Sequence, residues 1–358
     1  MKTLIRLTFI CGLFLFAVPA SAYEAEPLTA EESAAAAADY QRYCALCHGA
    51  DRAGNANDHA PSLRSKTLMH TGFPEFLLFT VAYGRRGTPM AGFFEEIGGP
   101  MNNAELFRLV RWLKEQVAVE SIDLPTDSIP GDSQRGRQIY EQECSRCHGD
   151  HAEGGTGPAI GNPALLALAS DAFLRYTIEH GRDGTEMPAF GAVLPDEDLD
   201  AVTAYLRSLE TNWTQEKPVL RAPPGPEEYI LNASAAAPEF ELKDGMYVMS
   251  ADLNRALQEK RRLVVLDTRV MSMWQIAHIE GAVPIPFYHD GIAGLSEHLP
   301  TDGTWIVAYC ECPRAAAESV TRKLRAAGFK NTAVLYEGIQ GWIALGYPVF
   351  VGEVAAAD

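Results

Sequence analysis

Upstream of residue 210, apolar residues recur at helical spacing with polar positions between them. Leu199, Val202 and Leu206 illustrate the pattern, because side chains three or four positions apart share one face of a helix. The pattern predicts two consecutive sets of helices, the second beginning roughly 100 residues after the first. The predicted helices are residues 31–43, 74–83 and 103–117, followed by 134–143, 171–180 and 196–209.

From about residue 240 the pattern changes to short, continuous apolar runs and one further helical stretch. Residues 211–239, rich in Pro and Ala, predict an extended linker before this region. Strands that alternate with helices form parallel sheets, so this region predicts an α/β domain. The apolar runs predict buried strands at residues 263–266, 283–287, 305–309 and 334–336, and residues 315–327 predict a helix that ends at Gly328.

Residues 1–22 have the features of a cleaved secretory signal peptide. Lys2 and Arg6 form a basic start, residues 7–18 an apolar run, and Ala20-Ser21-Ala22 a small-residue cleavage site. The apolar run is shorter than the roughly 20 residues that a spanning helix needs. We therefore expect an exported, periplasmic protein without a transmembrane anchor.

The charge and the cysteines narrow the function classes. The formal net charge of −17 argues against nucleic acid and anionic membranes as partners, and it favours redox partner proteins with a basic docking face. Of the seven cysteines, Cys11 lies in the predicted signal peptide. The other six, which are Cys44, Cys47, Cys144, Cys147, Cys310 and Cys312, each fall in a motif with chemistry of its own.

The motif Cys-x-x-Cys-His occurs twice, at residues 44–48 and 144–148. On one helical turn the two cysteines can form thioethers with the vinyl groups of a porphyrin, which leaves the histidine beneath the iron. The two copies predict two covalently bound haem c groups. Cys44, Cys47, Cys144 and Cys147 would attach them, and His48 and His148 would be axial iron ligands.

With these motifs, residues 33–118 and 132–210 each resemble a class I c-type cytochrome domain. The resemblance implies a small all-α fold around each haem, with Met90 and Met187 as the second axial ligands. Met187 lies in a Gly-Thr-Glu-Met-Pro-Ala-Phe loop before the last helix, where the family places its ligand, and Met101 is an alternative for the first iron. The resemblance also implies that the backbone carbonyls of Pro61 and Pro158 accept the ring N–H of the proximal histidines. If an iron were instead bound by two histidines, the second one would be His59, His70, His151 or His180.

Residues 240–352 resemble a rhodanese-like domain. The resemblance rests on Leu-Asp-Thr-Arg at residues 266–269, on residues 278–286, on Val-Ala-Tyr-Cys at 307–310 and on residues 337–342. It implies that Cys310, directly after a core strand, carries a persulfide, and that Arg314 adds a positive charge beside the bound sulfur. By the same reasoning His278 is structural, and Asp267 and Arg269 form an internal ion pair.

The loop after Cys310 departs from the usual pattern of catalytic rhodaneses. Glu311 brings a negative charge beside the thiol, and Pro313 has no N–H to give to an anion. Cys312 adds a second thiol, which could attack a persulfide on Cys310 or share a soft metal such as copper with it. A domain kept only for binding is the remaining alternative.

These features predict an exported dihaem cytochrome c that transfers electrons, coupled to the chemistry of a small sulfur compound at Cys310, Cys312 and Arg314. The alternative is a plain periplasmic electron shuttle to a respiratory reductase or oxidase, with the rhodanese-like domain as a docking or sensing module. The two differ in whether electron transfer needs Cys310.

Overall fold

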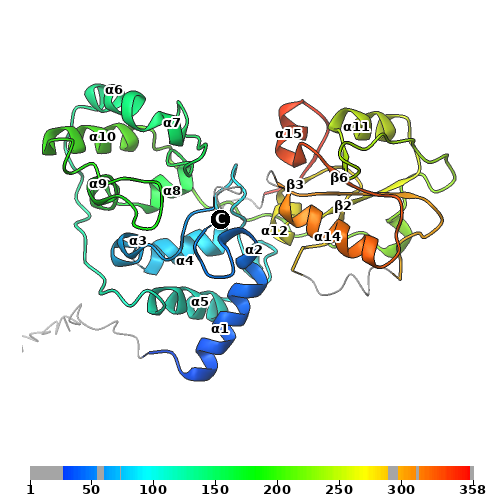
Figure 1. Ribbon diagram of the computed structural model, residues 1–358, viewed down its shortest axis with the longest axis horizontal. Helices are drawn as coiled ribbons and strands as arrows, with labels where there is room; N and C mark the ends of the chain where they lie inside the picture. The colour runs from blue at the N-terminus through cyan, green and yellow to red at the C-terminus, as the bar shows by residue number, and fades with distance from the viewer. Residues whose placement is uncertain (1–26, 55–59, 73, 289–296, 312–313, 355–358) are drawn as a thin grey trace, which may run out of the picture.

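The computed structural model describes residues 27–54, 60–72, 74–288, 297–311 and 314–354. It shows two helical domains and one α/β domain in chain order, which confirms the predicted fold class (Figure 1). The predicted signal peptide, residues 1–22, lies outside the described residues. Within the described part of the chain, no helix has the length and apolar character that a membrane crossing requires.

The first helical domain begins with α1 (Ala30–Tyr43), which packs against α5 (Asn103–Glu115). Thr29 and Glu32 cap α1 reciprocally, which satisfies two backbone N–H groups at its start. Leu106 and Leu109 on α5 and Tyr40 on α1 are fully buried in the shared core. The intervening elements are α2 (Ala45–His48), α3 (Lys66–Thr71), α4 (Pro74–Tyr83) and the 3₁₀ turn η1 (Glu95–Ile97).

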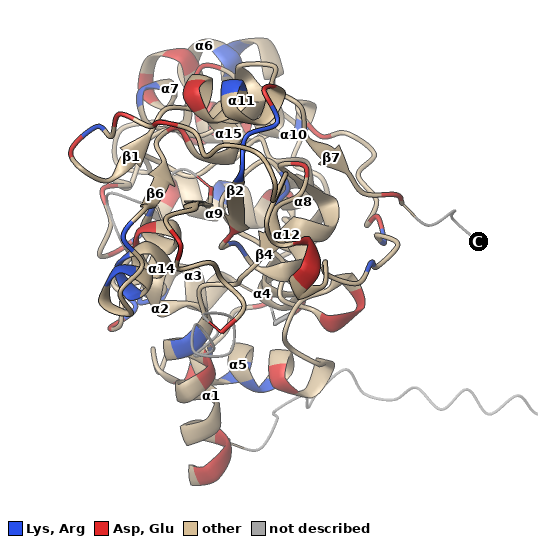
Figure 2. Cartoon of the chain, turned by 90° about the vertical axis from the view of Figure 1, so that its right-hand side faces the viewer, with Lys and Arg blue, Asp and Glu red and all other residues tan. Residues whose placement is uncertain are grey.

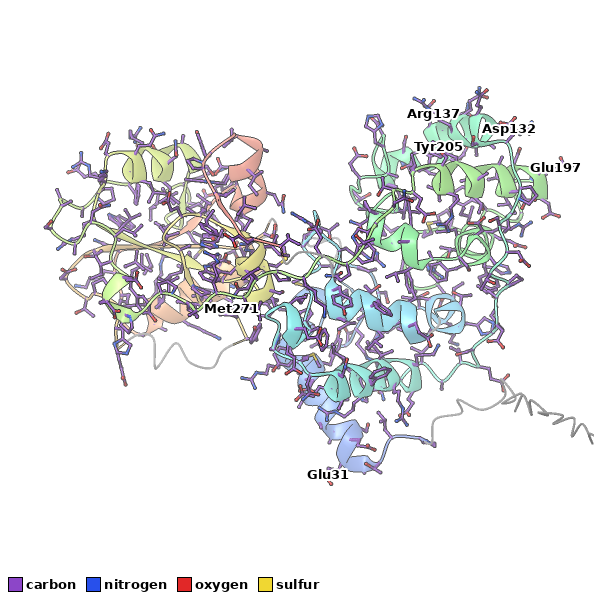
Figure 3. The ribbon with its side chains drawn as sticks, turned by 180° about the vertical axis from the view of Figure 1, so that it is seen from behind. Glu31, Asp132, Arg137, Glu197, Tyr205 and Met271 are labelled. Atoms are coloured by element: carbon purple, nitrogen blue, oxygen red, sulfur yellow. The ribbon has the colours of Figure 1, made fainter. Side chains whose placement is uncertain are left out.

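The second helical domain repeats this order with α6 (Ser133–Glu143), α7 (Ser145–His148), α8 (Pro163–Leu168), α9 (Asp171–His180) and α10 (Asp196–Ser208). Helices α6 and α10 cross closely (Figure 3). A Cβ atom at Gly136 would lie 1.9 Å from the carbonyl oxygen of Ala201, so only glycine permits this crossing. The predicted helices therefore all form, each within three residues of its expected bounds.

The two helical domains are joined by polar contacts at helix starts. Asp183, in the loop after α9, accepts hydrogen bonds from the Ser65 hydroxyl at 2.9 Å and from the Thr67 N–H at 2.8 Å, and so caps α3 of the other domain. Burial raises the pKa of Asp183, but the hydrogen bonds from Thr67, Lys66 and Ser65 outweigh it and hold the pKa well below its ordinary value.

A second polar contact links the two helical domains, and here a helix start of the second domain contacts a loop of the first. Asn162, the N-cap of α8, donates to the Arg86 carbonyl of the first domain at 2.9 Å. The rings of Phe76 and Phe173, which occupy equivalent helices of the repeat, lie 4.8 Å apart. The repeats thus face each other through equivalent surfaces, and the loops that carry Met90 and Met187 both lie near this interface.

The α/β domain is built on a five-stranded parallel sheet with strand order β1-β6-β5-β2-β4. The central strands β5 and β2 are almost completely buried, which explains their continuous apolar sequence. The sheet strands are β1 (Tyr247–Val248), β2 (Leu263–Asp267), β4 (Val283–Pro284), β5 (Trp305–Tyr309) and β6 (Thr332–Leu335). The helices are α11 (Ser250–Gln258), α12 (Met271–Ile276), α14 (Ala315–Ala326) and α15 (Gly338–Ala344), and β3 (Ala277–His278) pairs with β7 (Phe350–Val351).

The segment predicted as a linker is partly packed on the α/β domain. It contains the 3₁₀ turn η2 (Pro226–Glu228), and the Leu231 N–H donates to the Leu263 carbonyl at the start of β2. Leu231 thus extends the apolar core of the domain upstream of the expected boundary at residue 240.

The α/β domain docks on the first helical domain. Helix α14 lies beside α2, as both Figure 1 and Figure 2 show. The Ser272 hydroxyl on α12 donates to the Gly92 carbonyl at 2.5 Å, and the rings of Tyr43 and Tyr288 meet edge to face at 5.1 Å. Figure 3 shows Met271, at the start of α12, on the side of the α/β domain that faces the helical domains.

Candidate functional site

The Cys-x-x-Cys-His motifs form single helical turns, α2 and α7, directly after the long helices α1 and α6. The Nδ1–H of His48 donates to the Pro61 carbonyl at 3.0 Å, and that of His148 donates to the Pro158 carbonyl at 2.8 Å. These contacts are the ones expected of the two prolines, and they leave Nε2 of each ring for an iron. Burial lowers the pKa of both histidines, which favours the neutral form that binds metal.

A cavity of about 370 Å³ lies beside α2. Its walls include Cys44, Cys47, His48 and Met90, together with apolar side chains of α3, α4 and α5. The residues expected at the first haem are thus brought together around one apolar space.

The surroundings of the Arg85 side chain indicate whether a haem fits this cavity. It lines the cavity, and among the described residues its buried Nε has no hydrogen-bond partner. Burial lowers the pKa of Arg85 to about 10. A haem carries two propionate carboxylates, and a carboxylate here would satisfy the guanidinium. The equivalent Arg182 is likewise buried with Nη1 unpartnered within the described structure, so both domains fit the group.

The two methionines considered as second ligand of the first iron lie in different places, and Met90 stays the predicted ligand. Met90 lines the cavity, whereas Met101 is buried elsewhere, with its backbone paired to Phe93 and Glu95. Met187 occupies the same position in the second domain: the N–H of Arg182 bonds to its carbonyl, as that of Arg85 does to the Met90 carbonyl.

None of the alternative histidine ligands lines the cavity among the residues that the structure describes. His70 bonds to the Glu120 carbonyl, and the ring of His180 stacks on Tyr176 at 3.9 Å. His151 is exposed, and His59 lies outside the described residues.

Replacing Met90 by histidine is expected to lower the reduction potential of the first haem, because methionine ligation raises it relative to histidine. The shift should be a measurable part of the ~0.8 V range that axial ligands span. A spectroelectrochemical titration of the haem-loaded protein measures it. Met101→Leu is the matched control and should leave both potentials unchanged; a shift there, with none in Met90→His, would assign the ligand to Met101.

Cys310 follows β5 and is buried, with Sγ donating to the Glu311 carbonyl at 3.0 Å. Burial raises the pKa of the Cys310 thiol far above its ordinary value. Hydrogen bonding to the Ala317 N–H at the start of α14 opposes this rise, and the Glu311 charge adds to it. Cys310 therefore stays a thiol at neutral pH.

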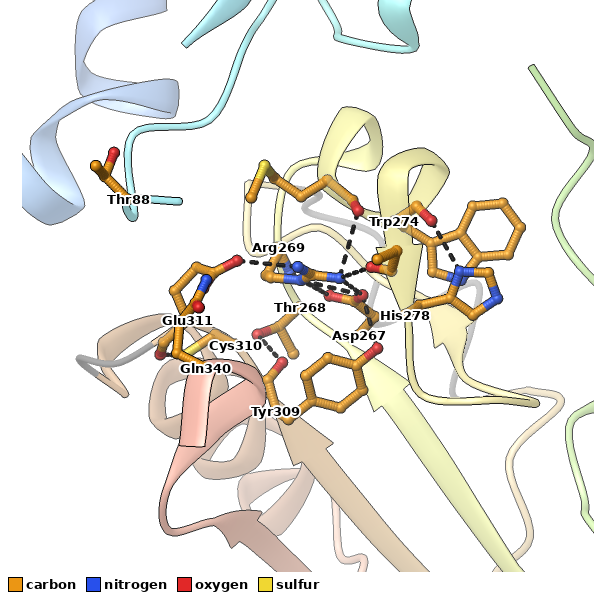
Figure 4. A network of polar contacts seen from close by, with 12 residues as sticks. Thr88, Asp267, Thr268, Arg269, Trp274, His278, Tyr309, Cys310, Glu311 and Gln340 are labelled. Atoms are coloured by element: carbon orange, nitrogen blue, oxygen red, sulfur yellow. Dashed lines mark hydrogen bonds and ion pairs between the residues drawn. The ribbon is translucent and has the colours of Figure 1, made fainter. Parts of the chain in front are cut away.

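Next to Cys310 lies a buried network of charges (Figure 4). The Arg269 guanidinium binds Asp267 through Nη2 at 2.7 Å and Glu311 through Nη1 at 2.9 Å. Gln340 donates to the other Glu311 oxygen at 2.7 Å, and the Tyr309 hydroxyl donates to Asp267 at 2.8 Å. The predicted Asp267–Arg269 ion pair is confirmed, whereas no sequence pattern indicated that Arg269 also binds Glu311.

Arg314 does not lie with this group. Its Nη1 donates to the Tyr336 carbonyl at 2.7 Å, and the guanidinium lies over the rings of Tyr336 and Tyr247 at 4.4 and 4.9 Å. A charge from Arg314 beside a bound sulfur stays a prediction. Cys312 and Pro313 lie outside the described residues. His278 stacks on Trp274 and bonds to its carbonyl, in agreement with a structural role.

The cavity beside α2 extends to the α/β domain. Cys310, Glu311 and Arg269 line it together with His48 and Met90, and Gly155 and Pro158 of the second helical domain also reach it. Thr88, from the loop that carries Met90, lines the same cavity as Glu311, and both residues are labelled in Figure 4. No sequence pattern indicated this arrangement, because it depends on how the three domains dock.

Two family models match the helical and the α/β parts of the chain. The family model "Cytochrome C oxidase, cbb3-type, subunit III" matches residues 31–113 and 131–206, and the model "Rhodanese-like domain" matches residues 250–345. The Anabaena sp. protein Alr3790, a solved structure, has 26% identity and a TM-score of 0.27, and covers 29% of this chain and 90% of its own.

Two curated relatives are oxidase subunits. The cbb3-type cytochrome c oxidase subunit FixP of Bradyrhizobium sp. is 31% identical over 46% of this chain and 57% of its own length. Subunit CcoP of Rhodobacter capsulatus is 29% identical over 54% of this chain and 68% of its own length. The match to FixP thus spans less than two thirds of that protein. By its family models and its fold, the chain consists of tandem class I c-type cytochrome domains followed by a C-terminal rhodanese-like domain.

Proposed function

We propose that this protein is a periplasmic dihaem cytochrome c that takes electrons from the oxidation of a sulfur compound at Cys310 and passes them to a redox partner. The observation that supports this is the shared cavity, which is lined by Cys310 of the rhodanese-like domain and by His48 and Met90 of the first cytochrome domain. A substrate bound at Cys310 would therefore lie next to the first haem site with no protein domain between them.

The reaction at Cys310 is an oxidative S–S bond formation. A compound H–S–R and the Cys310 thiol give Cys310–S–S–R, two protons and two electrons. One S–S bond forms, and two S–H bonds break. Bound haem supplies a one-electron acceptor in each cytochrome domain, so the two ferric haems match the two electrons released.

The chain's own residues serve this reaction in several ways. Burial and the Glu311 charge keep Cys310 protonated, which limits its side reactions with other electrophiles. The sulfur product can leave by attack of a second thiol, from Cys312 or from an acceptor in solution, which restores Cys310. The net charge of −17 would orient a partner with a basic docking face.

A second function, a plain electron shuttle with a rhodanese-like docking module, is favoured by one observation. The Arg314 guanidinium is held by Tyr336 and Tyr247 and does not line the cavity. In this case the cytochrome domains alone would carry electrons between a respiratory donor and a reductase or oxidase.

Anaerobic mixing of the oxidised, haem-loaded protein with sulfide, a persulfide, thiosulfate or sulfite distinguishes the two functions. We expect at least one of these compounds to reduce both haems with no other protein present, followed by the visible haem bands. If none of them reduces a haem that dithionite reduces fully, the rhodanese-like domain is not where electrons enter, and the shuttle is correct.

A further inference from the structure

We infer that the Cys310 site selects uncharged sulfur compounds, of which hydrogen sulfide is the smallest, and that Glu311 excludes anionic ones such as thiosulfate and sulfite. The inference rests on the proposed function, because it names the substrate class of the same site. It assigns Glu311 as a specificity-determining residue.

The first step concerns Arg269, a cation that lines the cavity together with Cys310 and Glu311. Its Nε and Nη2 bind Asp267 at 2.9 and 2.7 Å, and its Nη1 binds Glu311 at 2.9 Å. Nη2 also donates to the Ala277 carbonyl at 2.5 Å. These contacts use the Nε–H, both Nη2 hydrogens and one Nη1 hydrogen, so among the described contacts at most one of the five guanidinium donors is left for an anion.

The second step concerns the sign of the local charge. Asp267 and Glu311 contribute two negative charges against the single positive charge of Arg269, which leaves this cluster with a net charge of −1. The Glu311 side chain is only 8% exposed, and Gln340 fixes its second oxygen, so the charge cannot turn away into solvent. Arg314, which would offset it, lies over Tyr336 and Tyr247.

The third step concerns the rest of the wall around Cys310. Val270, Met273, Phe287 and Ala316 are apolar and line the same cavity. These four side chains offer no hydrogen bond to the oxygens of sulfite or thiosulfate, and burying an anion against them is costly. The Ala317 N–H at the start of α14, a donor among the described residues, bonds to the Cys310 sulfur. Arg85 lies on the cytochrome side of the cavity, where a haem propionate would neutralise it.

With hydrogen sulfide as the substrate, the step balances without an added reactant. H₂S and the Cys310 thiol give the persulfide Cys310–S–SH, two protons and two electrons, and the oxidant is the ferric haem pair. A neutral substrate enters without carrying charge past Glu311. The Glu311 backbone carbonyl accepts the Cys310 S–H at 3.0 Å, the proton that the reaction releases from Cys310.

Alkylation of Cys310 tests this charge selection without using the haems as a readout. The haem-loaded Cys312→Ser protein is treated with iodoacetamide or iodoacetate, which have similar size and differ by one negative charge. Peptide mass spectrometry follows the reaction at Cys310, and each rate is divided by that of the same reagent with free cysteine. The ratio of the two reagents cancels any change in the thiolate fraction of Cys310.

We expect iodoacetamide to be favoured by roughly tenfold or more, because an unpaired anion near a fixed negative charge in a poorly hydrated site is strongly disfavoured. Glu311→Gln keeps the size of the side chain and should bring the ratio close to 1. Glu318→Gln on α14, whose carboxylate binds Tyr247 and Arg322, is the matched control and should keep the wild-type ratio.

Equal ratios in the wild type and Glu311→Gln would overturn the inference, as would a wild-type ratio close to 1. These outcomes are separate from a failure of the proposed function. If alkylation is charge-selective but sulfide reduces no haem, the charge selection at Cys310 is supported and the proposed oxidation of a sulfur compound by the haems is wrong. If thiosulfate reduces the haems through Cys310, the coupling stands and the charge selection falls.

Discussion

Cys310→Ala is expected to abolish reduction of the haems by the sulfur compound, with a loss in rate on the order of 100-fold or more. The reason is that the S–S bond forms on the Cys310 sulfur, and no other described thiol shares its position in the cavity wall next to Glu311. Stopped-flow absorbance of the haem bands after anaerobic mixing with sulfide measures the loss.

Dithionite should reduce the Cys310→Ala protein as fast as the wild type, which shows that the haem sites are intact. Cys312→Ala is the matched control: the first reduction of the haems should persist there, and only repeated turnover should slow if Cys312 removes the bound sulfur. Equal rates of sulfide-driven reduction in Cys310→Ala and in the wild type would show that sulfide reacts at the haems directly.

Arg269→Met is expected to lower the stability of the rhodanese-like domain by about 3–5 kcal/mol. Arg269 is the only described cation bound to Asp267 and Glu311, whose side chains are 0% and 8% exposed. Its removal leaves two buried carboxylates close together and breaks the link between the end of β2 and the Cys310 loop. Native-state hydrogen exchange of β2 and β5 peptides measures this free energy within the full chain.

Arg322→Met provides the comparison for a surface ion pair. Arg322 is 59% exposed and binds Glu318 on the same helix, so its loss should change the stability by less than about 1 kcal/mol. If Arg269→Met and Arg322→Met were equally mild, the charge network around Glu311 would not be the rigid, buried unit described above.

Much of the cytochrome part could be predicted from local sequence. The apolar spacing gave the helices, because each long helix buries one face against another, as α1 does against α5. The attachment motif fixes Cys144, Cys147 and His148 on one turn, and a proline at similar spacing after each motif supplies the carbonyl that the histidine binds. These features depend on contacts within a short stretch of chain.

The features missed by sequence reasoning depend on docking between distant segments. Glu311 was expected only as an unfavourable charge beside Cys310, whereas Arg269, 42 residues away, binds it. Arg314 has aromatic neighbours on β1 and after β6 that hold it elsewhere, which no spacing rule indicates. The capping of α3 by Asp183 across the two cytochrome domains is of the same kind.

The central claim is that a sulfur compound is oxidised at Cys310 by the two haems. The most direct test titrates the oxidised, haem-loaded protein anaerobically with sulfide and measures both ferrous haem, by its absorbance, and persulfide on Cys310, by mass spectrometry. The account predicts two haems reduced for each Cys310 persulfide formed. Haem reduction without any sulfur on Cys310 would contradict it, as would persulfide formation that leaves both haems oxidised.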